Sequence, residues 1–415
     1  MNGITMRKWI ERIFVNSNIL RLWSGQVISQ TGDSMFQIGL LWLALEVTGS
    51  NAMAGSIAMM GYLPTLLFGL LAGALADRAD KRMLMLAADF ARGIVVLFVP
   101  VLYFVDGLSG LVLGLITFGI ALFNAVFNPA RDSLTVLLAR KEQLIRANSL
   151  IHTSWQFALL LGPPLAGLLI PLVGIVHLFT IDAATFFLSF YCIYLIRVPK
   201  VKTVSDRASF WQLLHLSWRD VAEGLRYARA DRRIWALLMI TLIDNLFIMG
   251  PAIIGAPIFV REVLKEGVSS YAYLELAYAV GMLIGTVGLN LVSHRYRKSH
   301  VLLWGIILDG ITFLPLLWVT TFWGAFLTVV VHATVIPMII IPRPTLIQKV
   351  VPHNLQGRVF SMIDVAVVGC TAVSLTLTGI VAEFVPINII FGFISFLAAG
   401  SGAVGWLIKE FRDTE

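Results

Sequence analysis

The chain has 415 residues, of which 58% are hydrophobic and only 13% are charged, far from the balance that a soluble domain needs. Its mean hydropathy of +0.86 therefore predicts a membrane protein. The net charge of +7 does not indicate a nucleic-acid partner, because the basic residues are spread over short loops instead of gathering on one face.

Twelve apolar windows are long enough to cross a membrane, since a spanning helix needs about 20 mostly apolar residues. The alternating polarity of a barrel strand is not seen in them. Each span must satisfy its own backbone hydrogen bonds in lipid, which predicts helices and an all-α membrane fold. The predicted spans lie near residues 19–46, 52–76, 83–105, 108–128, 148–171, 174–196, 234–260, 270–293, 300–320, 322–342, 359–382 and 386–408.

Polar residues follow one face of the first predicted span. Gln26, Gln30, Asp33 and Gln37 are spaced by four, three and four residues, which places all four on one side of a helix. An ionisable group within a span costs about 2.5 to 3.5 kcal/mol, so this face is expected to line a cavity or to meet a partner. Asp33 is the first candidate for a carboxylate that takes up and releases a proton. The alternative is a structural carboxylate that holds neighbouring helix ends or an arginine.

Two pairs of residues within the spans are assigned to packing. Asp89 and Arg92 are three residues apart in the third span, which favours a structural ion pair. Cys192 and Cys370 both lie in apolar runs, so they indicate neither a disulfide framework nor a metal site. No cofactor or metal is expected.

Other polar residues are assigned to the substrate cavity or to proton coupling. Asn124 in the fourth span and Trp155 in the fifth are expected to line a wide cavity. Asp244 and Asn245 lie in the seventh span, the counterpart of the first in the second half of the chain. A carboxylate that faces a partly dry cavity can take a proton from one side and release it to the other, so Asp244 is the second candidate.

One long polar connection divides the chain into two groups of six predicted spans. We therefore predict an N-terminal six-helix half over residues 1–198, a cytoplasmic linker over 199–233 and a C-terminal six-helix half over 234–415. Within the linker, Trp211, Leu214 and Trp218 recur at helical spacing. This pattern predicts an amphipathic helix on the inner membrane surface.

Two sequence echoes indicate that the halves are duplicated. Residues 73–82 read GALADRADKR and residues 292–299 read VSHRYRKS, so that Arg78 stands opposite Arg295 and Lys81 opposite Lys298. Residues 128–149 and 341–361 form a second echo at a similar offset. Such repeats predict a chain built from two duplicated six-span halves.

Lysine and arginine are distributed unevenly between alternate loops. Nearly all of the 31 lie at the N-terminus, in the even-numbered loops and at the C-terminus. The positive-inside rule therefore predicts a multi-pass protein with both termini in the cytoplasm.

The chain resembles bacterial transporters of the major facilitator superfamily, and within it the drug-efflux subgroup that includes macrolide exporters and the enterobactin exporter. The resemblance implies twelve transmembrane helices in two pseudo-symmetric six-helix halves, a monomer, and a location in the bacterial cytoplasmic membrane. The stretches that carry it are RLWSGQVISQTGDSM at 21–35, GALADRADKR at 73–82, NPARDSL at 128–134, EGLRYARADRRI at 223–234 and LQGRVFSMID at 355–364.

The resemblance gives the charge cluster at 73–82 the role of a gate. In the family its acidic residue, here Asp77, lies by the cytoplasmic start of the eleventh span, where helix dipole and free amides favour an anion. Arg358 is its expected partner, and His294 replaces the acid in the second copy. The alternative is a solvated loop of positive-inside charge. The gate residues are expected to be Gly73, Asp77, Arg78, Arg82 and Arg358.

The fifth span carries a kink of the kind found in the family's exporters. Residues 161–167 read LGPPLAG, which resembles the family's GPxxGG element with Ala166 in place of one glycine. Gly162, Pro163 and Gly167 would let helices approach closely and bend the span, which in the family accompanies antiport. The alternative is an ordinary proline kink of a membrane helix.

Together these patterns predict a proton-coupled exporter, or antiporter, of a moderately lipophilic small molecule such as a drug or macrolide. A dedicated siderophore or metabolite exporter, an importer and a lipid flippase on the same fold are the alternatives. The expected partners are the small-molecule substrate, protons and the bilayer. An enzyme is not expected, since the chain has neither GxxxxGK[ST] nor HExxH.

Overall fold

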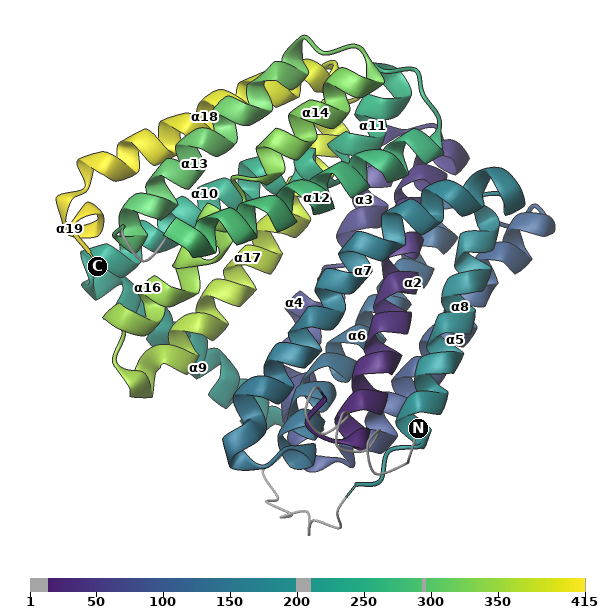
Figure 1. Cartoon of the computed structure of the whole chain (residues 1–415), viewed down its shortest axis with the longest axis horizontal. Coiled ribbons are helices and arrows are strands. Elements are labelled where there is room, and N and C mark those ends of the chain that lie inside the picture. The colour runs from purple at the N-terminus through teal and green to yellow at the C-terminus, as the bar shows by residue number, and fades with distance from the viewer. Residues whose placement is uncertain (1–13, 199–209, 293–295, 415) are drawn as a thin grey trace. The chain divides into compact units, whose positions relative to one another are not determined.

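The computed structural model describes residues 14–198, 210–292 and 296–414, and every regular element in these ranges is a helix (Figure 1). The all-α prediction is confirmed. Eleven helical stretches of the described chain are long and apolar enough to cross a membrane. The first predicted span does form a helix, α2 (Ser17–Thr48), but it is not among the eleven, so the count of twelve is not confirmed in full. The polar residues of α2 lower its hydropathy.

The chain folds into two compact units that nearly follow the sequence halves. The first unit contains the residues up to Leu43 together with Leu63–Leu213, and the second contains Ala44–Tyr62 and Leu214–Glu415. The segment Ala44–Tyr62 therefore packs with the second unit although it lies early in the sequence. The helix α2 runs through the point at Leu43 where the chain passes from one unit to the other.

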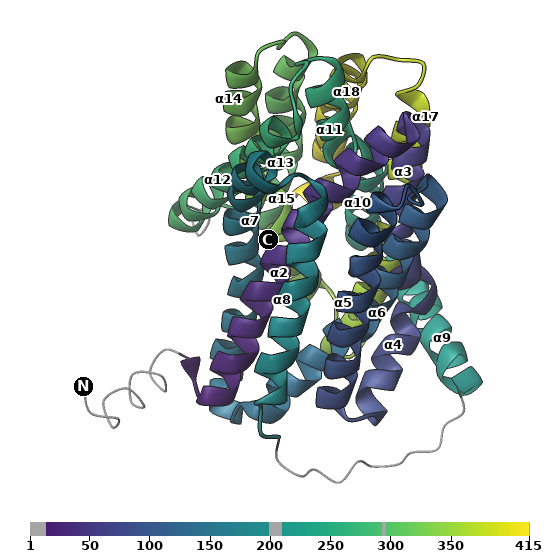
Figure 2. The same ribbon diagram turned by 90° about the vertical axis from the view of Figure 1, so that its right-hand side faces the viewer.

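The first unit is a bundle of long helices. Helix α5 packs against α6 and α8, and α4 packs against α6 (Figure 2). Its apolar core includes Leu22, Met85, Leu134 and Ile193, all fully buried. Besides most of α2, its elements are α4 (Leu63–Arg78), α5 (Lys81–Phe104), α6 (Gly110–Leu138), the short η1 (Lys141–Gln143), α7 (Leu144–Val173) and α8 (Val176–Tyr194).

The second unit contains more, and more often interrupted, helices. Its core includes Leu237, Leu302, Ile306 and Val359. Its elements are α3 (Asn51–Met60), α9 (Phe210–Ala230), α10 (Arg232–Ile253), α11 (Gly255–Glu262), α12 (Val268–Val292), α13 (Lys298–Phe313), η3 (Leu314–Leu317), α14 (Phe322–Ala333), α15 (Pro337–Ile340), α16 (Pro342–Val350), α17 (His353–Val381), α18 (Ile387–Leu407) and α19 (Lys409–Arg412).

Glycines allow α3 to pack tightly on α17 within the second unit. A Cβ atom added to Gly55 would meet the carbonyl of Leu375, and one added to Gly379 would meet the backbone of Asn51. Small residues bring membrane helices into close contact in this way. Polar contacts hold the start of α3, where Glu383 accepts hydrogen bonds from the Ser50 hydroxyl (2.6 Å) and the Ala52 amide (3.0 Å).

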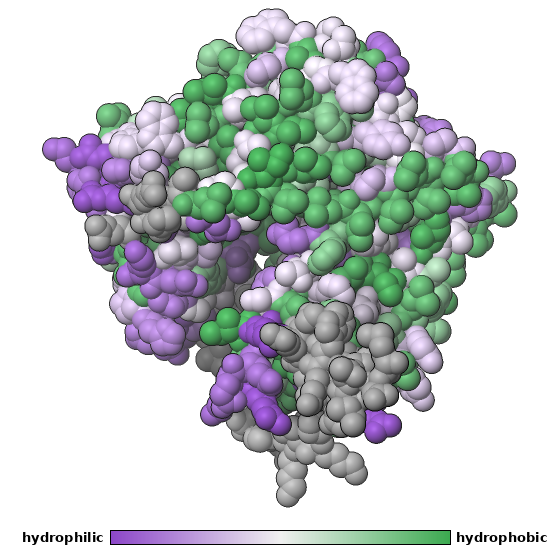
Figure 3. All heavy atoms as spheres, in the orientation of Figure 1, coloured by the Kyte–Doolittle hydropathy of each residue, from purple (hydrophilic) through white to green (hydrophobic). Residues whose placement is uncertain are grey.

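The apolar surface lies where the spans would meet lipid. Figure 3 shows hydrophobic residues over α12 and α14, and hydrophilic residues where α9 and α16 lie. Val287 and Leu291 on α12 are 54% and 69% exposed. Apolar side chains this exposed are expected on a helix that faces hydrocarbon.

The linker contains a helix, as its spacing predicts, and the described part of that helix packs on the second unit. Ala228 is fully buried in the core of that unit, and Gly224 lies against the backbone of Arg358. The membrane-surface prediction also rests on Trp218, Val221 and Leu225: Trp218 is 50% exposed, whereas Val221 and Leu225 pack against the core of the second unit. The side chains of Trp211 and Leu214 lie outside the described residues.

Candidate functional site

In the first unit, some side chains of the polar face of α2 form a chain of contacts with one another and with residues of α6 and α7. Gln30 donates to the Oε1 of Gln26 (3.2 Å) and accepts from the hydroxyl of Ser154 on α7 (2.9 Å). Arg131 of α6 lies 3.5 Å from the same Gln26 oxygen. Gln26 is 1% exposed, whereas Gln37 is exposed and lies outside this chain of contacts.

A buried arginine lies at the centre of the first unit. Arg92 of α5 is 2% exposed and pairs with Asp89 one turn before it, as the spacing predicts. It also donates to the side-chain oxygen of Asn124 on α6. Its guanidinium carbon lies 4.3 Å from the ring centres of both Phe127 and Phe186, so two aromatic faces enclose the charge.

Two more carboxylates approach this arginine from α2 and α8. Asp33 interacts electrostatically with Arg92 and Asp89, and Asp182 interacts with Asp33 and Arg92. The helices come close because of Gly32, where an added Cβ would collide with the side chains of Asp182 and Thr185.

Asp182 is fully buried, and one oxygen is 3.3 Å from the hydroxyl of Thr185. Its other oxygen has no hydrogen-bond partner in the described part of the chain. Asp89 is paired with Arg92, and Asp33 and Asp182 interact with it electrostatically; we call these four residues the Arg92 cluster.

The glycine-proline stretch of α7 that is predicted to be kinked contacts α2 on either side of Asp33. A Cβ on Gly162 would collide with the side chain of Ser34 and would lie 3.3 Å from the carbonyl of Thr31. Pro163 and Gly167 are buried in the same stretch of α7. Trp155, predicted to line the cavity, is 50% exposed and is not part of the Arg92 cluster.

The second unit has a separate charged group. Asp244 of α10 pairs with Arg343 of α16, a partner that sequence reasoning missed. Asp309 of α13 interacts electrostatically with both residues. Asp309 and the neighbouring His332 of α14 are 3.7 Å apart between Oδ1 and Nδ1 and are almost completely buried.

Asn245, the second polar residue of α10, makes local contacts. Its amide donates to the carbonyl of Thr241 (2.8 Å), and its oxygen lies 3.5 Å from the hydroxyl of Thr371 on α17. We call Asp244, Asp309, His332 and Arg343 the Arg343 cluster. One feature of the sequence pointed to Arg343. Residues 341–361 repeat the pattern of residues 128–149, and Arg343 corresponds to Arg131 in that repeat.

Two of the predicted gate residues, Arg82 and Arg358, make contacts within their own units, and Asp80 lies between Arg78 and Arg82. In the first unit Asp80 caps the start of α5 by accepting from the amide of Met83 (3.0 Å). Arg82 donates to the carbonyls of Ile193 (3.2 Å) and Tyr194 at the end of α8. Gly73 has nothing within 4 Å of an added Cβ.

Arg358 is held by acids of the linker helix. It contacts Asp220 at 3.1 Å and Glu223 at 2.6 Å. The side chain of Asp77, together with His294 and Arg295, lies outside the described residues. The pairing of Asp77 with Arg358 therefore stays a prediction, and so does a gating role for Arg78.

Comparisons with known proteins agree with this architecture. Residues 22–366 match the family model of the Major Facilitator Superfamily. Macrolide efflux protein A of Streptococcus pyogenes is 24% identical over 371 residues, which cover 88% of this chain and 90% of that protein. Multidrug efflux pump Tap of Mycolicibacterium fortuitum is 22% identical over 394 residues, covering 92% and 94%.

Solved structures show the same fold at low identity. The nucleoside transporter NupG superposes with a TM-score of 0.75 at 12% identity, covering 94% of this chain and 99% of that one. A bacterial homologue of the iron transporter ferroportin, in an inward-facing state, gives a TM-score of 0.73 at 14% identity, with 94% and 97% covered. With its apolar helices and its family match, the chain is a multi-pass membrane transporter, not an enzyme, and belongs to the major facilitator superfamily.

Proposed function

We propose that this transporter is a proton-coupled antiporter that exports a moderately lipophilic small molecule, such as a drug or a macrolide, by alternating access. Export is supported by its relatives, since the Streptococcus pyogenes protein is named for macrolide efflux and the Mycolicibacterium fortuitum protein for multidrug efflux. We also propose a monomer in a bacterial cytoplasmic membrane with both termini in the cytoplasm, on the distribution of Lys and Arg.

The observation that supports proton coupling most directly is the imbalance of the Arg92 cluster. One guanidinium interacts electrostatically with three carboxylates and pairs directly with only one of them, Asp89. Asp182 keeps one buried oxygen without a hydrogen-bond partner among the described residues. If all were ionised, two negative charges would remain uncompensated in a site with little water. Burying uncompensated charge is costly, so the cluster favours binding of a proton.

Asp33 is the member of the cluster best placed to pass on the effect of a proton. Its neighbours Thr31 and Ser34 lie against Gly162 at the kink of α7, so a movement at Asp33 would reach that kink directly. Leu45 lies on the same helix, about 18 Å beyond Asp33 at a rise of about 1.5 Å per residue. Its carbonyl accepts a hydrogen bond from Arg261 (2.7 Å). Protonation would remove one attraction to Arg92 and so change the position that α2 prefers.

Efflux measurements in a host that lacks its own pumps test the proposal. Cells that produce the protein should extrude macrolides or dyes, and a protonophore should stop the extrusion because it removes the proton gradient. Asp33→Asn should abolish the gradient-dependent part, since the amide cannot exchange a proton. Efflux that continues after the gradient has collapsed would exclude proton antiport.

A matched control lies on the same helix. Glu46 is an exposed carboxylate of α2, and Glu46→Gln should leave efflux unchanged. Both variants should be present in the membrane at the wild-type level. If no tested drug is extruded at all, a dedicated metabolite or siderophore exporter becomes the favoured function.

A further inference from the structure

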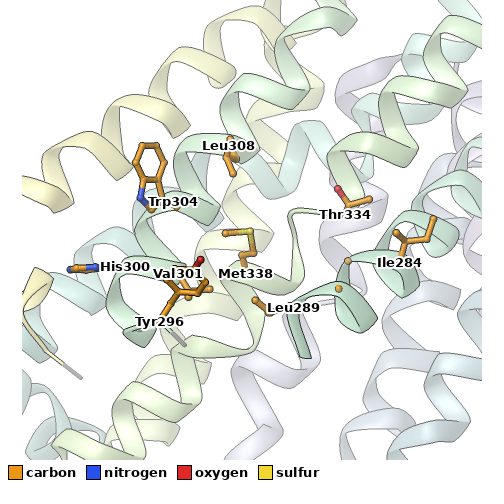
Figure 4. A pocket seen from close by; sticks show the side chains of 11 residues that line it. Ile284, Leu289, Tyr296, His300, Val301, Trp304, Leu308, Thr334 and Met338 are labelled. Atoms are coloured by element: carbon orange, nitrogen blue, oxygen red, sulfur yellow. The ribbon is translucent and has the colours of Figure 1, made fainter. Parts of the chain in front are cut away.

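A cavity of about 560 Å³ lies in the second unit, and its lining does not include the residues of the Arg343 cluster. Its walls come from α12, α13 and the α14–α15 segment (Figure 4). They are mostly apolar and include Leu289, Leu308 and Met338. The volume is within the range of about 300 to 1,000 Å³ that small-molecule sites occupy.

Two glycines on α12 shape the cavity in different ways. An added Cβ at Gly285 would collide with the backbone of Thr334, so this glycine allows α12 and α14 to pack closely. Gly288, in contrast, has nothing within 4 Å of an added Cβ, although it lines the same cavity. The absence of a side chain at Gly288 therefore leaves space that the protein does not fill.

The cavity has one polar end. Tyr296 and His300 lie at one end of the row of lining residues, and Ile284 and Thr334 lie at the other (Figure 4). The His300 ring packs on Trp406 at 4.8 Å between ring centres. Its buried Nε2 has no hydrogen-bond partner in the described part of the chain.

Positive charge predominates near this polar end. Arg297 lies 3.9 Å from Asp413, which Arg412 also contacts at 3.0 Å, so two guanidinium groups share one carboxylate. Hydrogen bonds from Arg412 lower the pKa of Asp413, and the charges of Arg297 and His300 act in the same direction. The first turn of α13 receives no side-chain cap from Arg297. Uncapped amides at a helix start favour an anion.

The apolar walls and the basic end fit one kind of ligand. We propose that this cavity binds an anionic membrane phospholipid, with an acyl chain along Gly288 and Leu289 and the phosphate near Arg297 and His300. Val287 and Leu291, on the same helix, are 54% and 69% exposed, so the cavity adjoins a surface that faces hydrocarbon. The basic residues are at the end of a span, the depth at which phospholipid phosphates lie.

Lipid retention by the purified transporter tests the acyl-chain part. The protein is extracted in detergent, titrated with dioleoyl phosphatidylglycerol, and the bound lipid is counted by native mass spectrometry. Gly288→Phe should weaken the tightest binding step by about tenfold, because losing room for as few as two CH₂ groups has that effect. Gly400→Phe is the matched control, since Gly400 is also an exposed helix glycine with nothing within 4 Å and lies outside the cavity.

Replacing the charged end tests the headgroup part. The wild type should prefer phosphatidylglycerol to dioleoyl phosphatidylcholine, and Arg297→Gln should reduce this preference by about fivefold, the effect of one basic residue near an anionic lipid. Binding of phosphatidylcholine should not change. Equal lipid binding by Gly288→Phe and Gly400→Phe, or equal wild-type affinity for the two lipids, would overturn the proposal. Size-exclusion profiles like that of the wild type ensure that a loss of binding does not reflect unfolding.

Discussion

The Arg92 cluster and the Arg343 cluster balance buried charge in different ways. Around Arg92, Asp33 and Asp182 join an arginine that already pairs with Asp89. Around Arg343, Asp244 pairs with the guanidinium, Asp309 interacts with it electrostatically, and His332 lies beside Asp309. The first cluster therefore has three acids for one arginine, and the second has two. Duplicated halves need not carry duplicated chemistry, and the imbalance favours the first unit as the place of proton coupling.

The largest expected effect comes from neutralising one acid of the Arg92 cluster, compared with removing the ion pair of the Arg343 cluster. Asp182→Asn should reduce gradient-dependent efflux by about tenfold or more, as expected when a group that transfers protons is lost. The double variant Asp244→Asn with Arg343→Gln removes an ion pair without changing the net charge, and it should keep most of the efflux. The reverse result, measured with the same drugs, would move the coupling site to the second unit.

A smaller effect is expected on stability when each arginine is removed. Arg92→Met should cost about 3 to 5 kcal/mol, because it leaves buried carboxylates without their cation. The side chain of Arg343 is 17% exposed and that of Arg92 only 3%, so Arg343→Met should cost about half as much or less, since water screens the exposed pair. Unfolding titrations of the purified proteins in dodecyl sulfate provide the measurement. Equal losses would mean that the clusters do not differ in burial energy.

The smallest effect is expected from pH at the start of α3. Hydrogen bonds from the Ala52 amide and the Ser50 hydroxyl lower the pKa of Glu383 below its ordinary value of 4.5. The stabilisation should therefore be complete above about pH 4.5 and should be lost as the pH falls through the lowered folded-state pKa. Hydrogen exchange of the Ala52 and Met53 amides should become faster at low pH. In Glu383→Gln the exchange rates, corrected for intrinsic chemistry, should no longer depend on pH in this range.

The sequence was sufficient for the helices because their signal is local. In lipid the backbone must form its hydrogen bonds within each segment, so long apolar windows become helices. Most of the predicted spans are helices in the structure. Several spans are divided between helices: α3 ends at Met60 before α4 begins at Leu63, α10 ends at Ile253 before α11 begins at Gly255, and the stretch Phe322–Val350 contains α14, α15 and α16. The count differed at α2 because the polar residues of this helix reduce its hydropathy.

The partners of charged residues could not be predicted in the same way. Asp33 and Asp182 meet because Gly32 removes the side chain that would separate α2 from α8, and this contact joins residues far apart in sequence. Arg343 meets Asp244 across 99 residues. Helical periodicity indicates which residues share a face, but it does not say which helix packs against that face. Asp89 and Arg92 were predictable because they lie on neighbouring turns of one helix.

The assignment of Ala44–Tyr62 to the second unit has a consequence for biosynthesis. Ser50 and its partner Glu383 are separated by 333 residues. At a translation rate of about 5 to 20 residues per second, roughly 20 to 60 s pass between the synthesis of α3 and the synthesis of the end of α17. During that time the glycine face of α3 is without its final neighbour, so another membrane component must cover it or the helix must remain loosely placed. The last steps of translation then complete the packing of one of the first helices made.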